Sequence, residues 1–230
     1  MRLAIGLAAT LLTGALVGCG GSSGRSQFAT PTVTVDWGAR SKGVDGPTSA
    51  LSFHFDLKDS VAGHTYSTWD GNRSTDPAAY SADYSGSATV RAGTYIFVGN
   101  FYAGTDQGGA AVGTVSAPVT VLINGSLRRP DGSPFDGIAF APAIKSVVVN
   151  GQAVTVGNST TLTATAYDAN NQAIAVSPGS FTWATLTGSD VLSLTADGTA
   201  TGIKVGMATV RAKTDGITSN STSIDVTAPG

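Results

Sequence analysis

The side chains that could do chemistry are few in this chain of 230 residues. Apart from hydroxyls, they comprise two histidines, one cysteine and fifteen acidic residues, all of them aspartate, with no glutamate. His54 alternates with Phe53 and Phe55, so we expect it on the opposite, solvent-facing side of a strand. His64 lies in an Ala-Gly-His-Thr stretch typical of a turn or a strand start. Both histidines are therefore predicted to be surface side chains.

A metal site would have to combine the two histidines with Asp56 or Asp59, and this spacing matches no known ligand motif. The stretch Asp168–Gln172 resembles the start of an EF-hand loop, but the glycine at the sixth position and the glutamate at the twelfth are missing. We interpret it as a hairpin turn and predict no metal site. A surface calcium ion between loop aspartates is the alternative.

Motifs for catalysis are also missing from the sequence. A serine nucleophile needs a histidine that a carboxylate orients, and no Gly-x-Ser-x-Gly elbow occurs. A glycosidase needs two carboxylates in a cleft, whereas the aspartates here sit beside Gly, Asn, Pro or strand ends, where they favour turns. We predict a protein that is not an enzyme, with no catalytic residue and no cofactor. The alternative is an activity that depends on His54 or His64.

The charge balance argues against a nucleic-acid partner. Thirteen Lys and Arg residues against fifteen Asp residues give a formal net charge of −2, and phosphate backbones are bound by clustered basic residues. The nearest approach to such a cluster, Arg128-Arg129, lies in a Gly- and Pro-rich stretch. We expect this pair to be solvated and predict no nucleic-acid binding.

The composition predicts an all-β protein. Glutamate is absent and lysine is scarce, although both are strong helix formers for surface positions. Thr, Val, Tyr and Phe fill the alternating segments instead, as pleated strands prefer. With 41% apolar and 12% charged residues, the chain can form hydrophobic cores and is not of a disordered class.

The amino-terminal segment has the features of an export signal. Met1-Arg2 is followed by an apolar run from Leu3 to Val17, which is shorter than the roughly 20 residues of a membrane-spanning helix and fits a secretory signal. The run ends in Leu16-Val17-Gly18-Cys19, which resembles the bacterial lipobox. The resemblance implies cleavage between Gly18 and Cys19, so that residues 1–18 form a lipoprotein signal peptide. An uncleaved helical anchor is the alternative.

The same resemblance implies that Cys19 is acylated on its thiol and on its new amino group. Several acyl chains anchor a protein to a membrane almost permanently, at about 0.8 kcal/mol for each buried methylene. Residues 19–31 would then form the lipidated cysteine and a flexible tether, rich in Gly and Ser. Gly20 rather than Asp follows the cysteine, which the enteric sorting rule associates with the outer membrane. Because no other cysteine exists, the folded part has no disulfide.

Residues 32–123 are predicted to form an immunoglobulin-like β-sandwich. Short alternating segments are separated by Gly-, Asn- and Pro-containing turns. Gly93–Phe97 resembles the tyrosine corner of immunoglobulin domains, with Phe97 where antibody domains have a cysteine. We expect Phe53 or Phe55 to face Phe97 from the other sheet and Trp69 to be a core tryptophan. Residues 124–143, which contain three prolines and two Asp-Gly pairs, are predicted to be a linker.

Residues 144–228 resemble the bacterial immunoglobulin-like group 2 domain of intimin- and invasin-type adhesins. The resemblance covers the Thr-rich strand 160–166, the turn at Asp168–Asn171, the core tryptophan Trp183, and the Val205–Ala212 pattern near the end. Leu162, Ala164 and Ala166 alternate with threonines, which indicates one buried and one wet face. The fold class is therefore predicted to be two tandem immunoglobulin-like β-sandwich domains after a lipoprotein signal peptide.

These features favour a non-catalytic module that is anchored to the cell envelope through lipid. Its partners would be the membrane and an envelope protein, in a structural, adhesion or interaction role. The alternative is a glycan-binding module that uses exposed aromatic side chains of the first domain. Trp37, at a strand end beside Gly38, is the candidate binding aromatic.

Overall fold

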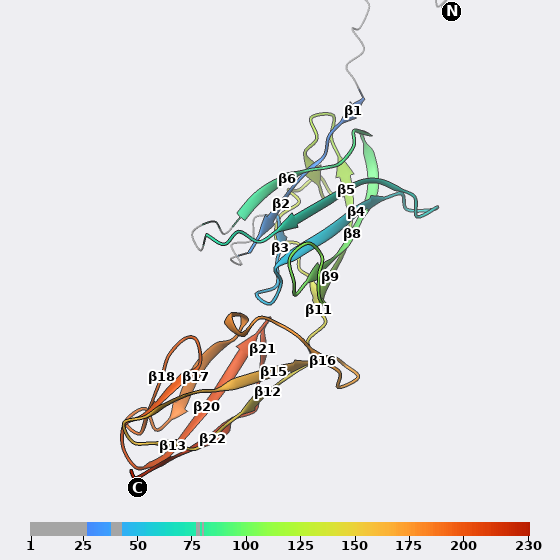
Figure 1. The fold of residues 1–230 in the computed structure, drawn as a ribbon. Helices are drawn as coiled ribbons and strands as arrows, with labels where there is room; N and C mark the ends of the chain where they lie inside the picture. Colours follow the sequence, from blue (N-terminus) through green and yellow to red (C-terminus); the bar gives the residue numbers. More distant parts are fainter. Residues whose placement is uncertain (1–26, 38–42, 77–78, 80) are drawn as a thin grey trace, which may run out of the picture.

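A computed structural model of the protein describes residues 27–37, 43–76, 79 and 81–230 (Figure 1). Gly18 and Cys19, with the predicted signal peptide and most of the tether, lie outside these residues. The described part is built from β-strands and one short 3₁₀ helix, η1 (Pro178–Ser180). No helix in it is long and apolar enough to span a membrane.

The first half of the chain forms two facing sheets and a small two-stranded sheet. The larger sheet has the order β10-β9-β8-β4-β5, with β11 also paired to β9; the facing sheet is β3-β2-β6, and β1 pairs with β7. The strands are β1 (Phe28–Ala29), β2 (Thr32–Asp36), β3 (Val44–Asp45), β4 (Ser52–Lys58), β5 (Thr65–Asn72), β6 (Ser81–Ser85), β7 (Val90–Arg91), β8 (Gly93–Tyr102), β9 (Ala111–Val121), β10 (Leu127–Arg128) and β11 (Ala141–Pro142).

An aromatic core fills the space between these sheets. The alternation in β4 directs Phe53, Phe55 and Leu57 inward, where all three are fully buried. Phe97 of β8 is also fully buried and lies 4.9 Å from Phe55 and 5.5 Å from Trp69, measured between ring centroids. Because such aromatic side chains bury large apolar areas, this cluster accounts for much of the domain's stability without a disulfide.

The tyrosine corner is present in the first domain. The hydroxyl of Tyr95 donates a hydrogen bond of 2.7 Å to the backbone carbonyl of Arg91, four residues upstream, as the motif requires. The expected position of Phe53 or Phe55 across from Phe97 is wrong, because β4 pairs directly with β8 in one sheet. Phe135, in the segment between β10 and β11, also contacts Phe97, at 5.3 Å between ring centroids.

The prediction of a linker over residues 124–143 is wrong. This segment folds back onto the first domain, where β10 and β11 both pair with β9. Leu127, Phe135 and Ile138 are buried in the core. The Pro and Asp-Gly pairs form turns within the segment, as in the Gly132 N–H to Arg129 carbonyl bond of 2.9 Å. The sequence gives little sign of this packing because the apolar residues between the turns are widely spaced.

The second half of the chain forms a second sandwich from three sheets. Their orders are β12-β15-β16, β13-β22-β20-β17 with β21 paired to β20, and β14-β19-β18. The strands are β12 (Ser146–Asn150), β13 (Val154–Thr155), β14 (Ser159–Thr161), β15 (Thr163–Tyr167), β16 (Ala173–Ile174), β17 (Thr182–Thr187), β18 (Leu192–Leu194), β19 (Thr199–Gly202), β20 (Gly206–Thr214), β21 (Ile217–Thr218) and β22 (Thr222–Thr227).

The Thr-rich segment of the second domain is divided between two sheets. β14 pairs with β19 and β15 pairs with β12, and Leu162 lies at the break, where its N–H donates to the carbonyl of Gly198. Leu162 and Ala166 are buried as the alternation predicts. Trp183 is only half-buried at the edge of this core rather than enclosed by it.

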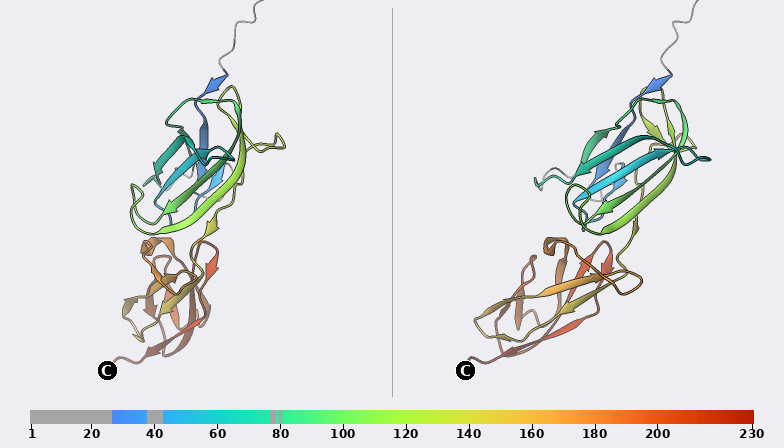
Figure 2. Two further views of the ribbon diagram at one scale, coloured as in Figure 1. Left: turned by 90° about the vertical axis from the view of Figure 1, so that its right-hand side faces the viewer. Right: turned by 45° about the vertical axis from the view of Figure 1, so that its right-hand side comes forward.

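The described chain forms two immunoglobulin-like β-sandwich domains in tandem. Every strand pair among the described residues joins strands within 28–142 or strands within 146–227. The domains are stacked end to end in all views, with β1 at one end and the carboxyl terminus at the other (Figures 1 and 2). The two ends of the described chain therefore lie at opposite ends of the structure.

Candidate functional site: exposed surfaces of the two domains

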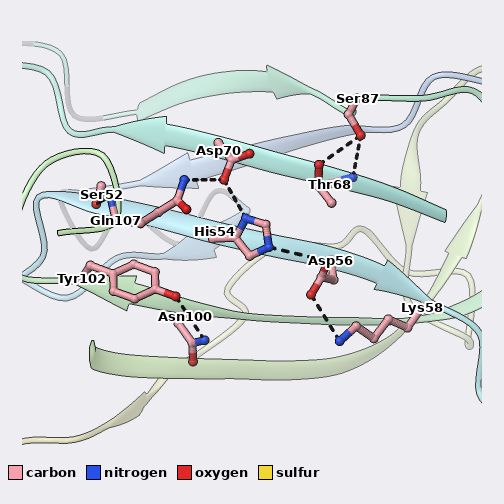
Figure 3. A network of polar contacts seen from close by, with 10 residues as sticks. All are labelled: Ser52, His54, Asp56, Lys58, Thr68, Asp70, Ser87, Asn100, Tyr102 and Gln107. Atoms are coloured by element: carbon pink, nitrogen blue, oxygen red, sulfur yellow. Dashed lines mark hydrogen bonds and ion pairs between the residues drawn. The ribbon is translucent and has the colours of Figure 1, made fainter. Parts of the chain in front are cut away.

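A polar network covers the outer face of the larger sheet in the first domain (Figure 3). The alternation that buries the phenylalanines of β4 directs His54, Asp56 and Lys58 to this outer face. The position of His54 opposite Phe53 and Phe55 is thus confirmed, with 32% of its side chain exposed.

His54 lies between two carboxylates. Its Nδ1 is 2.6 Å from Oδ1 of Asp70, the residue directly across from it on β5. Its Nε2 is 3.6 Å from Oδ1 of Asp56, whose other oxygen is 3.2 Å from the ammonium of Lys58. Since these groups are partly exposed, each pair contributes little stability, of the order of 0–1 kcal/mol. These side chains instead define a polar surface of hydrogen-bond donors and acceptors.

This arrangement lacks the nucleophile of a catalytic triad. A triad needs a hydroxyl hydrogen-bonded to the ring nitrogen that the carboxylate does not hold, but Nε2 of His54 faces Asp56. The nearest serine on β4, Ser52, is buried and donates to the carbonyl of Gly104 at 2.6 Å while accepting from the N–H of Gln107 at 2.8 Å. The described residues contain no group of three or more His, Cys or Asp side chains placed to hold a metal ion.

A loop between β8 and β9 closes one end of the polar face. The side chain of Gln107 donates to Oδ1 of Asp70 at 2.6 Å, and Asn72 and Asp106 exchange two hydrogen bonds of 2.7 and 2.8 Å. Asp106 and Gln107 both have left-handed backbone φ angles, 51° and 62°, which Asp tolerates better than most residues. Together with Gly71 these residues line a shallow hollow of about 160 Å³. The sequence pattern revealed the β4 part of this face but not the loop.

Trp37 is not an exposed binding aromatic, contrary to the prediction. Only 3% of it is accessible, and its ring centroid lies 6.1 Å from that of Phe53 and 5.9 Å from that of Phe101. The cause is strand parity, because Trp37 continues the inward series of Val33 and Val35. The alternation along the strand predicts that Trp37 is buried, whereas its position next to Gly38 suggests exposure.

The exposed aromatic side chains of the first domain lie elsewhere. Tyr66 is 43% exposed and packs edge-on against His64, with 4.7 Å between ring centroids, and against Tyr95 at 5.5 Å. Near the amino-terminal end, Phe28 is 58% exposed. Tyr66 and His64 therefore replace Trp37 as the aromatic surface that a ligand could contact.

Exposed apolar side chains gather at one end of the second domain. Leu186, Ile203, Val205 and Met207 are each 43–65% exposed. Leu186 lies on β17, which pairs with β20, and Met207 lies at the start of β20. Ile203 and Val205 lie in the preceding loop, where the N–H of Ile203 donates to the carbonyl of Val191. We call these four residues the distal apolar cluster. β20 starts here, where Gly206 pairs with Val226 near the carboxyl terminus, and ends beside the first domain. The start of β20 therefore lies at the end of the described structure farthest from β1.

Comparison with known proteins finds distant structural likenesses only. The N-terminal part of the bacterial S-layer protein SbsC matches with a TM-score of 0.31 and 12% identity over 86% of this chain and 44% of that chain. Domains 4 and 5 of SbsC match at 0.31 and 14% over 86% and 98%, and chicken VE-cadherin EC1-2 at 0.29 and 14% over 91% and 88%. This chain spans less than half of the first SbsC structure. No family model and no curated protein matches. The fold assignment therefore rests on the strand pairing and the tyrosine corner.

Proposed function

We propose that this protein is a lipid-anchored, non-catalytic module of the bacterial cell envelope that presents its second domain to a protein partner. The observation that supports this most directly is the end-to-end order of the two domains, with β1 at one end and the carboxyl terminus at the other (Figures 1 and 2). Such an arrangement holds a contact surface away from the membrane.

The anchoring part of the proposal rests on the lipobox-like residues that end in Gly18-Cys19. Acylation of Cys19 would attach the amino-terminal end of the first domain to the bilayer through a short Gly- and Ser-rich tether. Gly20 favours the outer membrane as the destination. The order of motifs in residues 144–228 favours a bacterial immunoglobulin-like group 2 domain as the part that projects outward.

The interaction part of the proposal rests on the distal apolar cluster. Large apolar side chains that are exposed near one another commonly mark protein contacts. Lys204 and Asp190, 3.5 Å apart at the margin of the cluster, supply a polar rim of the kind found around protein interfaces.

The anchor is tested by Cys19→Ser in the native host. The full-length protein should fractionate with membranes and yield an acylated amino-terminal peptide by mass spectrometry, whereas the variant should carry no acyl chain. A matched control, Cys19→Ser combined with Ser22→Cys, keeps a cysteine in the tether outside the lipobox and should also remain unacylated. An unmodified, full-length amino terminus in the wild-type protein would contradict the proposal.

The partner surface is tested by Val205→Asp combined with Met207→Asp. Crosslinking of intact cells followed by quantitative mass spectrometry should give one or more envelope proteins joined to the wild type and depleted in this variant. Val148→Asp, which alters a residue 46% exposed on a different strand of the same domain, is the control and should leave the crosslinks unchanged. Equal crosslinking by all three proteins would exclude the distal cluster as the contact.

Glycan binding is the second candidate function, and the exposed Tyr66 beside His64 is the observation that favours it. Tyrosine combines apolar area with a polar tip, which suits contact with a sugar ring. A glycan array should then show a ligand that is bound by the wild type and lost in Tyr66→Ala, whereas Phe28→Ala binds normally. An array without any ligand, or equal binding by the wild type and Tyr66→Ala, removes this candidate.

A further inference from the structure

The second domain contains a pocket that plays no part in the proposed function. Its volume is about 220 Å³, and all nine residues that line it belong to this domain. They come from the break between β14 and β15, from the segment around η1, from the start of β17 and from the turn before β19: Thr161, Leu162, Thr163, Ala164, Val176, Pro178, Phe181, Trp183 and Asp197.

The walls of this pocket are largely apolar. Leu162 and Phe181 are 3% and 4% exposed and connect the pocket to the core, while Trp183 is half-buried at its side. Gly198 packs closely on the edge of the indole, where a Cβ atom would come within 2.8 Å of the ring. Gly198 has a φ of 87°, so the Asp197-Gly198 turn fits against Trp183 in a conformation that glycine adopts without strain.

A single carboxylate stands at the mouth of the apolar pocket. Asp197 accepts hydrogen bonds from the hydroxyl of Thr195 and, at 3.3 Å, from the N–H of Thr199. The hydrogen bonds from Thr195 and then Thr199 hold the pKa of Asp197 below its usual value, so it is ionised near neutral pH. Among the described residues, no ion pair involves Asp197, whereas the carboxylates of Asp56 and Asp190 both have a cationic partner. Its negative charge is thus available to a ligand.

We propose that this pocket binds the side chain of a lysine or arginine presented by a partner protein. The alkyl stem of such a side chain would lie against Leu162 and Trp183, and the cation would reach Asp197. Long basic side chains bury their apolar stems while their charged ends stay at the surface. An uncharged apolar side chain would fill the pocket but leave the carboxylate without a partner, and an acidic side chain would be repelled by it.

NMR titration of the mature chain, residues 19–230 with Cys19→Ser, tests this site. The probes are the Nα-acetyl amides of arginine, lysine and norleucine, of which norleucine has a similar stem without a charge. The indole N–H signal of Trp183 reports on the pocket, and those of Trp37 and Trp69, buried in the first domain, serve as internal references. We expect the arginine or lysine probe to shift the Trp183 signal and to bind at least tenfold more tightly than norleucine. Equal binding of norleucine, or no shift at Trp183, overturns the proposal.

Two variants separate the carboxylate's role from a general charge effect. Asp197→Asn should reduce the affinity for the cationic probe to that of norleucine, whereas Asp225→Asn, which removes an exposed carboxylate of β22 in the same domain, should leave it within twofold. Equal losses in both variants contradict the assignment. If Asp197→Asn fails to fold, a salt series on the wild type decides instead. Raising the salt from about 0.05 M to about 0.5 M must weaken binding of the cationic probe alone, because only that contact is screened.

Discussion

Asp215 of the second domain accepts hydrogen bonds from both the backbone N–H and the hydroxyl of Ser49 in the first domain. The bond to the N–H is 3.0 Å long, and the same carboxylate also accepts from the hydroxyl of Thr48 at 3.0 Å. Thr48 returns the contact, because its hydroxyl accepts from the N–H of Asp215 at 3.2 Å. Asp215 is at the β20–β21 turn with a left-handed φ of 47°. One residue of a tight turn thus joins the two domains by four hydrogen bonds.

Replacement of Asp215 by alanine should loosen this junction. Ser49 is fully buried, so its donors would lose their acceptor without ready access to water, at a cost of about 1–3 kcal/mol. We expect the free energy of unfolding to fall by that amount and the relative orientation of the domains to become variable. Denaturant unfolding and residual dipolar couplings measure the two effects. Asp190→Ala, an exposed control, should change neither, and domain orientations that stay unchanged in Asp215→Ala would exclude a clamping role.

Replacement of Phe97 by alanine should destabilise the first domain by about 3–5 kcal/mol, since the side chain is fully buried among Phe55, Trp69 and Phe135. Tyr95→Phe, which removes only the corner hydrogen bond, should cost about 0.5–1.5 kcal/mol. Urea unfolding followed through the indole NMR signals of Trp69 and Trp183 separates the two domains. A larger loss in Tyr95→Phe than in Phe97→Ala would refute this account of the core.

Replacement of Trp37 by alanine should act on stability and not on ligand contact. Trp37 is 3% exposed and packs on Phe53 and Phe101, so its loss should cost about 3–5 kcal/mol. Tyr66→Ala, at an exposed position, provides the comparison and should cost far less. Thermal unfolding of both variants is the measurement, and a Trp37→Ala protein as stable as the wild type would show that the ring does not belong to the core.

The stability of the second domain should depend on pH through Asp197. Hydrogen bonds from Thr195 and Thr199 lower the pKa of this carboxyl in the folded protein. A group with a lowered folded pKa stabilises the protein above its unfolded pKa, about 3.9, and loses that contribution as pH falls through the folded value. The stability difference between wild type and Asp197→Asn should therefore be constant above about pH 5 and shrink below about pH 4. Urea midpoints of the second domain at several pH values measure it. A difference that stays the same across this range would contradict the lowered pKa.

The polar face and the apolar core of the first domain show what alternation can reveal. In β4, parity alone assigned Phe53 and Phe55 to the core and His54 to the surface, because successive side chains of a strand point to opposite faces. The same rule applied from Val33 onward would have placed Trp37 inside. It could not show that Asp70 contacts His54 and accepts a hydrogen bond from Gln107, since these contacts depend on which strand lies beside β4 and on where the β8–β9 loop folds back.

By itself the sequence determined the all-β class, the tyrosine corner and the turn at Asp168, because these depend on residue propensities and on contacts over a few positions. The tertiary structure alone decided that residues 124–143 fold onto the first domain, that β4 lies beside β8 and that Asp215 joins the two domains. Each of these contacts joins segments that are far apart in the chain. Which segments pair depends on the apolar surfaces that are buried together and on the hydrogen-bond donors that need an acceptor in the folded protein.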